Sequence, residues 1–241
     1  AWNWDAGATD GKTYTVTVVA SGGGNKFRFD GFAQDAVTLD LAEGGTYIFN
    51  YPSGHPFRFS TVADGTHGGG SEYTTGVTEV STTQIKITVA ASAPQLFYYC
   101  SIHSGMGGAI NTNSTQGSSN FDGALQSIVK VNQTAGFSIV KWTSGGSTAT
   151  VGHGLGVKPT ITIQKRIVGA TSNWSVYYDF RDGSYDYLRL NLDSAHLSSA
   201  ASVPTSSVFY QTYTSGTMIG YCFSEVAGYS KFGIYKGNGS T

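Results

Sequence analysis

Three residues that can bind a metal lie close together in the first half of the chain. Cys100, His103 and Met106 follow a C-x2-H-x2-M pattern, directly after the apolar, aromatic run 97–99. The run predicts a buried strand, and the glycines around Met106 predict a tight loop at its end. A thiolate, an imidazole and a thioether are the ligands of a trigonal copper site with a long axial methionine, provided that a second histidine completes the set.

The missing histidine must come from another part of the chain, and His55 is the best-placed candidate. It lies between two strand-like runs, about 45 residues before Cys100. Adjacent strands of one β-sandwich would bring two such segments together. The alternative is His67, in the glycine-rich stretch 64–70. For His67, however, a histidine of a flexible loop without a metal-binding role is the favoured interpretation.

These two segments resemble those of the cupredoxins, the blue copper proteins. Cupredoxin ligands are one histidine on an early loop and a cysteine, a histidine and a methionine on the loop before the last strand, and the short spacing here is most similar to the amicyanin-type loop. The resemblance implies copper as the cofactor and the following ligands: His55, Cys100, His103 and Met106. Many cupredoxins place an asparagine after the first histidine, which ties the two ligand segments together. This chain has Pro56 there, a departure that affects the expected rigidity and redox tuning of the site.

A purely structural interpretation of the same residues stands beside the copper site. A single cysteine after an aromatic strand is usually a small buried hydrophobic residue, and a histidine in a glycine-rich loop is usually a solvated turn residue. A β-sandwich can also keep such a loop for packing without a metal. The second cysteine, Cys222, lies in the strand-like run 220–223 and is predicted to be a core residue, so no disulfide framework is expected.

The overall composition indicates a β-rich protein with many turns. Only 12% of the 241 residues are charged, whereas 13% are aromatic and 33 are glycine. The net charge of −1 at pH 7 argues against nucleic-acid binding, and no apolar run approaches the roughly 20 residues of a membrane span. We find no phosphate-binding loop, paired-carboxylate motif or nucleophile elbow, and the aspartates of segment 179–186 are too loosely arranged to act as acid and base. We therefore do not expect an enzyme.

The strand-like runs divide the chain into two β domains. Residues 9–112 contain runs for about seven or eight short strands, which is the size of one Greek-key sandwich of roughly 100 residues. Residues 113–126 are polar and without periodicity, and they are predicted to be a linker. A new series of strand-like runs fills residues 127–241. The predicted fold is therefore all-β, with a Greek-key, cupredoxin-like β-sandwich inserted in, or followed by, a second β-sandwich-like module.

An internal similarity suggests a serial arrangement of β units. Residues 136–142 and the glycine- and serine-rich turn after them resemble residues 228–235 and the turn that follows. A second copy of a strand and its turn is therefore predicted near the end of the chain. Elongated fibres are built from similar β units in series, since each unit buries its apolar face against a neighbour.

The second half of the chain also resembles a β module that recurs in virion structural and tail-fibre proteins of marine bacteriophages. The similar segments are residues 131–140, 151–159 and 228–232, and the opening residues of the chain resemble the beginning of the same module. This resemblance implies that residues 1–8 belong with residues 127–241. The copper-type sandwich would then be an insertion in the phage module.

The two resemblances together imply a non-enzymatic structural component of a phage particle, either a tail fibre or a surface appendage that faces the host receptor. The expected location is the virion. The expected partners are further copies of the chain, with a trimer favoured, other virion proteins, and a host surface glycan or protein. The alternative is a type 1 copper electron-transfer protein, in which Met106 tunes the potential. In a third interpretation, a metal or the packed ligand loop only stabilises the inserted domain.

Two further groups of residues have both a functional and a structural interpretation. His153 lies between glycines, where it can approach a metal or a ligand, but a turn residue at a subunit or strand junction is favoured. The tyrosines of segments 177–178 and 185–187 can stack on sugars. Aromatic alternation in strands more often reflects core or cross-strand packing, which is the favoured interpretation.

Overall fold

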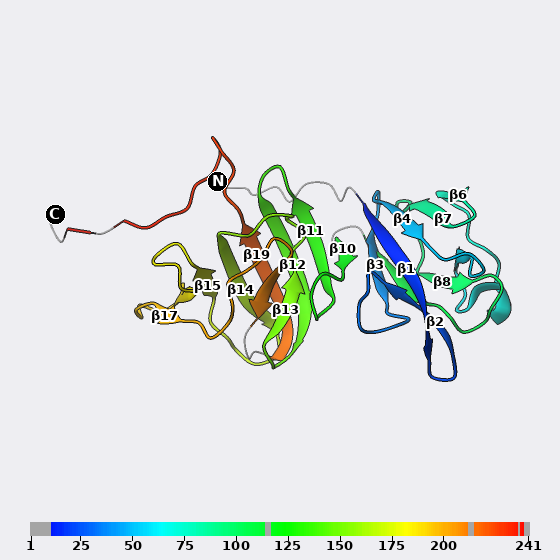
Figure 1. Ribbon diagram of the computed structural model, residues 1–241, viewed down its shortest axis with the longest axis horizontal. Coiled ribbons are helices and arrows are strands. Elements are labelled where there is room, and N and C mark those ends of the chain that lie inside the picture. The colour runs from blue at the N-terminus through cyan, green and yellow to red at the C-terminus, as the bar shows by residue number, and fades with distance from the viewer. Residues whose placement is uncertain (1–10, 114–116, 212–214, 236, 239–241) are drawn as a thin grey trace. The chain divides into compact units, whose positions relative to one another are not determined.

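The computed structural model describes residues 11–113, 117–211, 215–235 and 237–238 (Figure 1). These residues form strands and one short 3-10 helix, η1 (Gly65–Gly68), which confirms the prediction of an all-β fold. The chain divides into two compact units between residues 124 and 125. The predicted assignment of residues 1–8 to the second module lies outside the described residues. Within the described ranges, no helix has the length and apolar character needed to cross a membrane.

The first unit is a sandwich of two sheets. One sheet has the order β2-β1-β4-β7-β6, formed by the segments Gly24–Phe29, Lys12–Ser21, Thr46–Asn50, Gln84–Thr88 and Val77–Ser81. The other has the order β3-β9-β8-β5, formed by Leu39–Ala42, Gly108–Asn113, Leu96–Cys100 and Phe57–Ser60. The pairs β1–β4 and β3–β9 are parallel, and the other neighbouring pairs are antiparallel. The pair β3–β9 therefore joins the early part of the unit to the strand that follows the predicted ligand loop.

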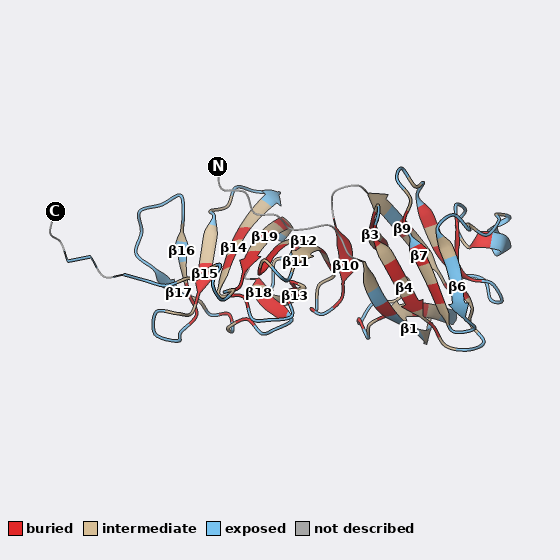
Figure 2. Cartoon of the chain, turned by 90° about the horizontal axis from the view of Figure 1, so that it is seen from above, coloured by how far each residue is buried: buried red, intermediate tan, exposed pale blue. Residues whose placement is uncertain are grey.

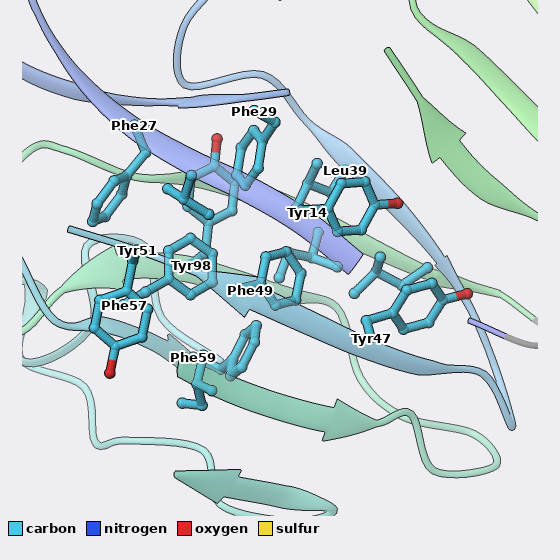
Figure 3. Packing of buried hydrophobic residues seen from close by; sticks show 14 of the residues in the cluster. Tyr14, Phe27, Phe29, Leu39, Tyr47, Phe49, Tyr51, Phe57, Phe59 and Tyr98 are labelled. Atoms are coloured by element: carbon cyan, nitrogen blue, oxygen red, sulfur yellow. The ribbon is translucent and has the colours of Figure 1, made fainter. Parts of the chain in front are cut away.

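The two sheets enclose a core of aromatic side chains, which Figure 3 shows at close range. In β2 and β4, buried residues alternate with less buried ones, because successive side chains of a strand point to opposite faces. Phe49 is fully buried, and its ring centroid lies 4.8 Å from that of Phe57 and 5.2 Å from that of Tyr14. The hydroxyl group of Tyr98 donates a hydrogen bond to the carbonyl oxygen of Val37 at 2.7 Å. The core thus buries large rings and still provides its phenol groups with partners.

Part of the predicted linker 113–126 belongs to the fold of the first unit. This stretch contains the short strand β10 (Ser118–Asn120). The hydroxyl group of Tyr14 donates to the carbonyl oxygen of Ser119 at 2.8 Å, and Phe121 is only 4% exposed within the aromatic core. Buried phenol groups need hydrogen-bond partners, and this polar segment supplies them. Residues 118–121 are therefore a packed element rather than a linker.

The second unit contains a larger antiparallel sheet and a smaller second layer (Figure 2). The order β11-β12-β19-β14-β15-β16-β17 is formed by Ser127–Asn132, Phe137–Gly145, Ser215–Phe223, Ile161–Val168, Ser175–Tyr178, Asp186–Arg189 and Leu197–Ser198. The second layer pairs β13 (Ala149–Gly152) with β18 (Val208–Gln211). Both layers contribute to a core that contains Trp142, Phe209 and Cys222. Cys222 is thus a buried strand residue, as its sequence context predicts.

The second copy of a strand that is predicted near the end of the chain does not form. Residues 228–235 contain no strand, and Tyr235 is 94% exposed. Phe232 packs back on the unit, with its ring centroid 6.1 Å from that of Phe223. The similar segment β12 is paired with β11 and β19, whereas residues 228–235 have no neighbouring strand in the described part of the chain. Similar residues form a strand only where partner strands complete their hydrogen bonds.

Candidate metal centre

Three of the four predicted copper ligands converge in the first unit. One ligand atom from each of His55, Cys100 and His103 lies within 4.8 Å of the other two. The Sγ atom of Cys100 is 3.6 Å from Nδ1 of His103, and the ring centroids of His55 and His103 are 4.7 Å apart. Two segments about 45 residues apart thus supply one compact set of sulfur and nitrogen atoms.

Strand pairing brings the two ligand segments together. β5 and β8 are antiparallel neighbours, with Phe57 opposite Cys100. His55 therefore lies just before the start of β5, beside the end of β8, where the ligand loop begins. The amide of Ser101 donates to the carbonyl oxygen of Pro56 at 3.1 Å, so hydrogen bonding continues past the ends of both strands.

The ligand loop, residues 101–107, turns sharply because of two glycines. Gly105 has a φ of 70°, a region that residues with a Cβ atom rarely adopt. A Cβ atom on Gly107 would lie 1.7 Å from the carbonyl oxygen of Tyr98, so only glycine fits at that position. The loop can therefore leave β8 and return to the core within a few residues.

Met106, the fourth predicted ligand, is fully buried in the same core cluster as Cys100. Its carbonyl oxygen accepts a hydrogen bond from the amide of Phe27 at 3.0 Å, which ties the ligand loop to β2. A thioether in this cluster would be a weak additional ligand for copper if the ion were bound. The same side chain also fills the core, as methionine commonly does.

The ligand residues differ in their exposure to solvent. Cys100 is fully buried, His55 is partly buried and His103 is exposed. The Nδ1 atom of His55 is itself buried and has no hydrogen-bond partner among the described residues. Burial and the neighbouring His103 lower the pKa of His55, which favours the neutral imidazole that a metal requires. A buried imidazole nitrogen without a partner is unfavourable, and a metal ion would satisfy it.

Two hydrogen bonds from η1 and its N-terminal flanking residue hold the ligand loop, although Pro56 stands where many cupredoxins have an asparagine. The carboxylate of Asp64 accepts a hydrogen bond from the amide of Gly105 at 2.8 Å. The Nε2–H group of His67 donates to the carbonyl oxygen of Cys100 at 3.0 Å. These bonds tie η1 to the segment that carries Cys100, and the bond from the amide of Ser101 to Pro56 ties that segment to the one that carries His55, so no asparagine is needed.

His67 lies in the helical turn η1 and contacts the ligand segment without belonging to the ligand group. Its ring packs edge to face with Tyr99 at a centroid distance of 6.4 Å. Gly65 lies against the same tyrosine, since a Cβ atom there would come within 2.5 Å of the ring. The sequence interpretation of a flexible-loop histidine missed this packing, because glycines indicate a turn but not the surface on which it rests.

The other candidate histidine and cysteine are engaged in structural contacts in the second unit. His153 is fully buried, its Nε2–H group donates to the carbonyl oxygen of Thr205, and its Nδ1 atom accepts from the amide of Leu155, both at 3.2 Å. Burial raises the pKa of the Cys222 thiol to about 12, which keeps it neutral. Neither side chain offers a free ligand atom. His153 is fully buried, and it directly follows β13 and bonds to the segment before β18, which places it at a strand junction.

The donor set of the first unit fits copper. His55, Cys100 and His103 would hold the ion, with Met106 as a weak additional ligand. A bound copper ion would supply one-electron redox chemistry. The contributions of the chain itself are a buried thiol, imidazoles held close to it, and a short loop fixed by hydrogen bonds.

Comparison with known proteins assigns the second half of the chain to a family. No curated protein and no solved structure matches the chain. Residues 111–241, more than half of the chain, match the family described as the domain of unknown function DUF7483. This match begins after the predicted copper ligands and does not include the metal centre. The chain therefore belongs to the DUF7483 family.

Proposed function

We propose that the protein is a structural component of a phage particle that carries a cupredoxin-like, copper-binding module. The observation that carries the metal-binding part is the convergence of His55, Cys100 and His103 together with the unpaired, buried Nδ1 atom of His55. The buried structural histidine of the second unit, His153, uses both ring nitrogens in hydrogen bonds. The contrast supports a ligand role for His55 over a packing role.

The virion part of the proposal is supported by the resemblance of residues 131–140 and 151–159 to phage structural modules and by a β-rich chain with few charges. The proposed location is the virion, in a homo-oligomer with other virion proteins as neighbours. A trimer is favoured, because thin β modules bury little surface alone. Light scattering of the purified full chain measures its mass. A trimer mass is expected, and a strict monomer at micromolar concentration would contradict the proposal.

The ion pairs of the aspartates in segment 179–186 support a non-enzymatic role. Asp186 accepts a hydrogen bond from Nε of Arg181 at 2.6 Å, and Asp182 pairs with the same guanidinium at 2.8 Å. Asp179 forms an ion pair with Lys158. The pKa values of Asp182 and Asp186 are lowered by hydrogen bonds and ion pairs, which makes the two carboxyl groups poor proton donors.

A type 1 copper electron-transfer protein is the second candidate, and one observation favours it. His103 is exposed, and its neighbour Ile102 is 57% exposed at the same end of the first unit. An exposed ligand beside an apolar side chain suits the docking of a redox partner. NMR line broadening in mixtures of oxidised and reduced copper protein measures electron self-exchange. Exchange that is slowed by Ile102→Glu is expected for a carrier, and undetectable exchange argues against this candidate.

Copper loading of the full chain tests the site itself. We expect equimolar copper(II) to produce an intense visible thiolate-to-copper absorption band and to raise the thermal unfolding temperature of the first unit. Cys100→Ser should abolish the band. Cys222→Ser, which changes the other buried cysteine, should retain it. A folded wild-type protein that shows neither the band nor the stabilisation would rule out the copper site.

A further inference from the structure

A cleft of about 460 Å³, lined by both polar and aromatic side chains, opens in the second unit over strands β14, β15 and β16. We call it the β15–β16 cleft, and its lining includes Gln164, Asn173, Tyr177, Tyr187, Arg189 and Ser199. The metal centre lies in the other unit and uses none of these residues. The cleft is therefore a separate candidate site.

Strand register forms the floor of this cleft. In the antiparallel pair β15–β16, Tyr177 is opposite Tyr187 and Ser175 is opposite Arg189. Gln164 of β14 is in turn opposite Ser175. Directly opposed residues of neighbouring strands project from the same face of a sheet, and so do alternate residues of one strand. Two aromatic rings, a guanidinium group and an amide thus stand side by side on one face.

The two tyrosines form an aromatic platform with a rigid base. Their ring centroids are 5.3 Å apart, and Tyr177 also stacks on Tyr185 at 5.4 Å. Tyr177 is only 6% exposed, whereas Tyr187 is partly open to solvent. The face of an aromatic ring carries partial negative charge, so it attracts the weakly positive C–H groups on one face of a sugar ring. The platform therefore favours a saccharide over a flat, highly charged ligand.

Arg189 is the one charged residue that lines the cleft, and no carboxylate is among its lining residues in the described part of the unit. Its guanidinium lies 5.9 Å from the ring centroid of Tyr187 and has no ion pair or hydrogen bond with any described residue. By contrast, Arg58 and Arg181 each pair with two carboxylates. A guanidinium group binds a carboxylate through two parallel hydrogen bonds, so Arg189 is available for an acidic ligand.

From these observations we propose that the β15–β16 cleft binds a carboxylated sugar unit of an oligosaccharide. The ring of Tyr187 packs against the sugar, Arg189 pairs with its carboxylate, and Asn173 and Ser199 hydrogen-bond to its hydroxyl groups. The volume of the cleft is within the range of small-ligand sites. A neutral sugar would leave Arg189 unpaired, at a cost in binding free energy.

Isothermal titration calorimetry on the full chain tests this proposal with three acidic oligosaccharides: trigalacturonate, trimannuronate and sialyllactose. The control ligand is the methyl ester of whichever of the three oligosaccharides binds most tightly. We expect the wild-type protein to bind the acid at least about tenfold more tightly than the ester. Arg189→Gln should lower the affinity for the acid to that for the ester and leave the affinity for the ester unchanged. Tyr187→Ala should abolish binding of both ligands, whereas Tyr187→Phe, which keeps the ring, should retain both.

Two control variants isolate the cleft from other effects. Lys130→Gln removes one positive charge from β11, at the other end of the sheet order, and should bind as the wild type does. Cys100→Ser should also bind normally, which separates this site from the copper site. Three results would overturn the proposal: no binding of any of the three saccharides, equal affinity for acid and ester, or equally tight binding of a polyglutamate peptide, because that peptide has carboxylates but no sugar ring.

Discussion

The Nε2–H group of His67 donates a hydrogen bond to the carbonyl oxygen of Cys100, with an N···O distance of 3.0 Å. Because a carbonyl oxygen only accepts hydrogen bonds, the proton of a neutral His67 must be on Nε2. The bond joins η1 to the residue that supplies the thiol, 33 positions along the chain. Together with the bond from the amide of Gly105 to Asp64, it fixes the ligand loop near both of its ends.

Removal of the Asp64 carboxylate should loosen the ligand loop. Asp64→Ala deletes the acceptor for the amide of Gly105 and places alanine at a φ of 58°, which asparagine and aspartate tolerate better. Loss of a group that orients metal ligands typically lowers metal affinity about tenfold or more, which we expect for Asp64→Ala. Asp64→Asn keeps a carbonyl acceptor and should bind copper nearly as the wild type does. Titration against a copper chelator measures the copper affinity of the wild type and both variants. Equal affinities for all three proteins would exclude this positioning role of Asp64.

Replacement of Met106 by leucine should separate ligand and packing roles. The two side chains have similar volumes, so Met106→Leu in the buried cluster should cost less than about 1.5 kcal/mol of stability. The visible band of the copper-loaded variant should remain, because the thiolate of Cys100 is still present. If Met106 is a ligand, the reduction potential should change, because a thioether ligand would tune it. Voltammetry of both proteins measures the difference, and an unchanged potential would assign Met106 to packing alone.

Truncation of Phe49 should destabilise the first unit strongly. The fully buried ring packs against Phe57 and Tyr14, and its removal leaves a cavity between the two sheets. We expect Phe49→Ala to lower the free energy of unfolding of this unit by about 3–5 kcal/mol. Val80→Ala, at a site that is 50% exposed in the same unit, should change it by less than about 0.5 kcal/mol. Urea unfolding followed by circular dichroism measures both, and similar midpoints for the two variants would contradict the expectation.

The stability of the second unit should depend on pH through Asp186. The hydrogen bond from Arg181 lowers the pKa of Asp186 below its ordinary value of 3.8. The stabilisation is therefore complete above 3.8 and is lost as the pH falls through this value towards the lower pKa of the folded state. Asp186→Asn should be less stable than the wild type at neutral pH, and the difference should shrink in acid. Urea unfolding in a series of neutral to acidic buffers checks this, and a difference that does not change with pH would count against the ion pair.

Most strands of both units can be predicted from the sequence, because their patterns are local. In β4, Tyr47 and Phe49 are separated by one less buried residue, a period of two that requires no knowledge of the fold. β6 cannot be predicted in this way, because it is an exposed strand at the edge of its sheet and its residues do not alternate between buried and exposed. β10 is not predicted either, because its residues are polar and show no apolar alternation; its hydrogen bonds with the hydroxyl groups of Tyr14 and Tyr47 join residues far apart in the sequence.

For the metal centre, the sequence by itself determined the ligand types and the short spacing of Cys100, His103 and Met106. Only the tertiary structure decided that His55 reaches this group within 4.8 Å and that His67 bonds to a carbonyl oxygen instead. The physical reason is the range of each constraint. Spacing inside one loop follows from a few covalent bonds, whereas the distance between remote segments depends on the register of the pair β5–β8, and no local pattern encodes that register.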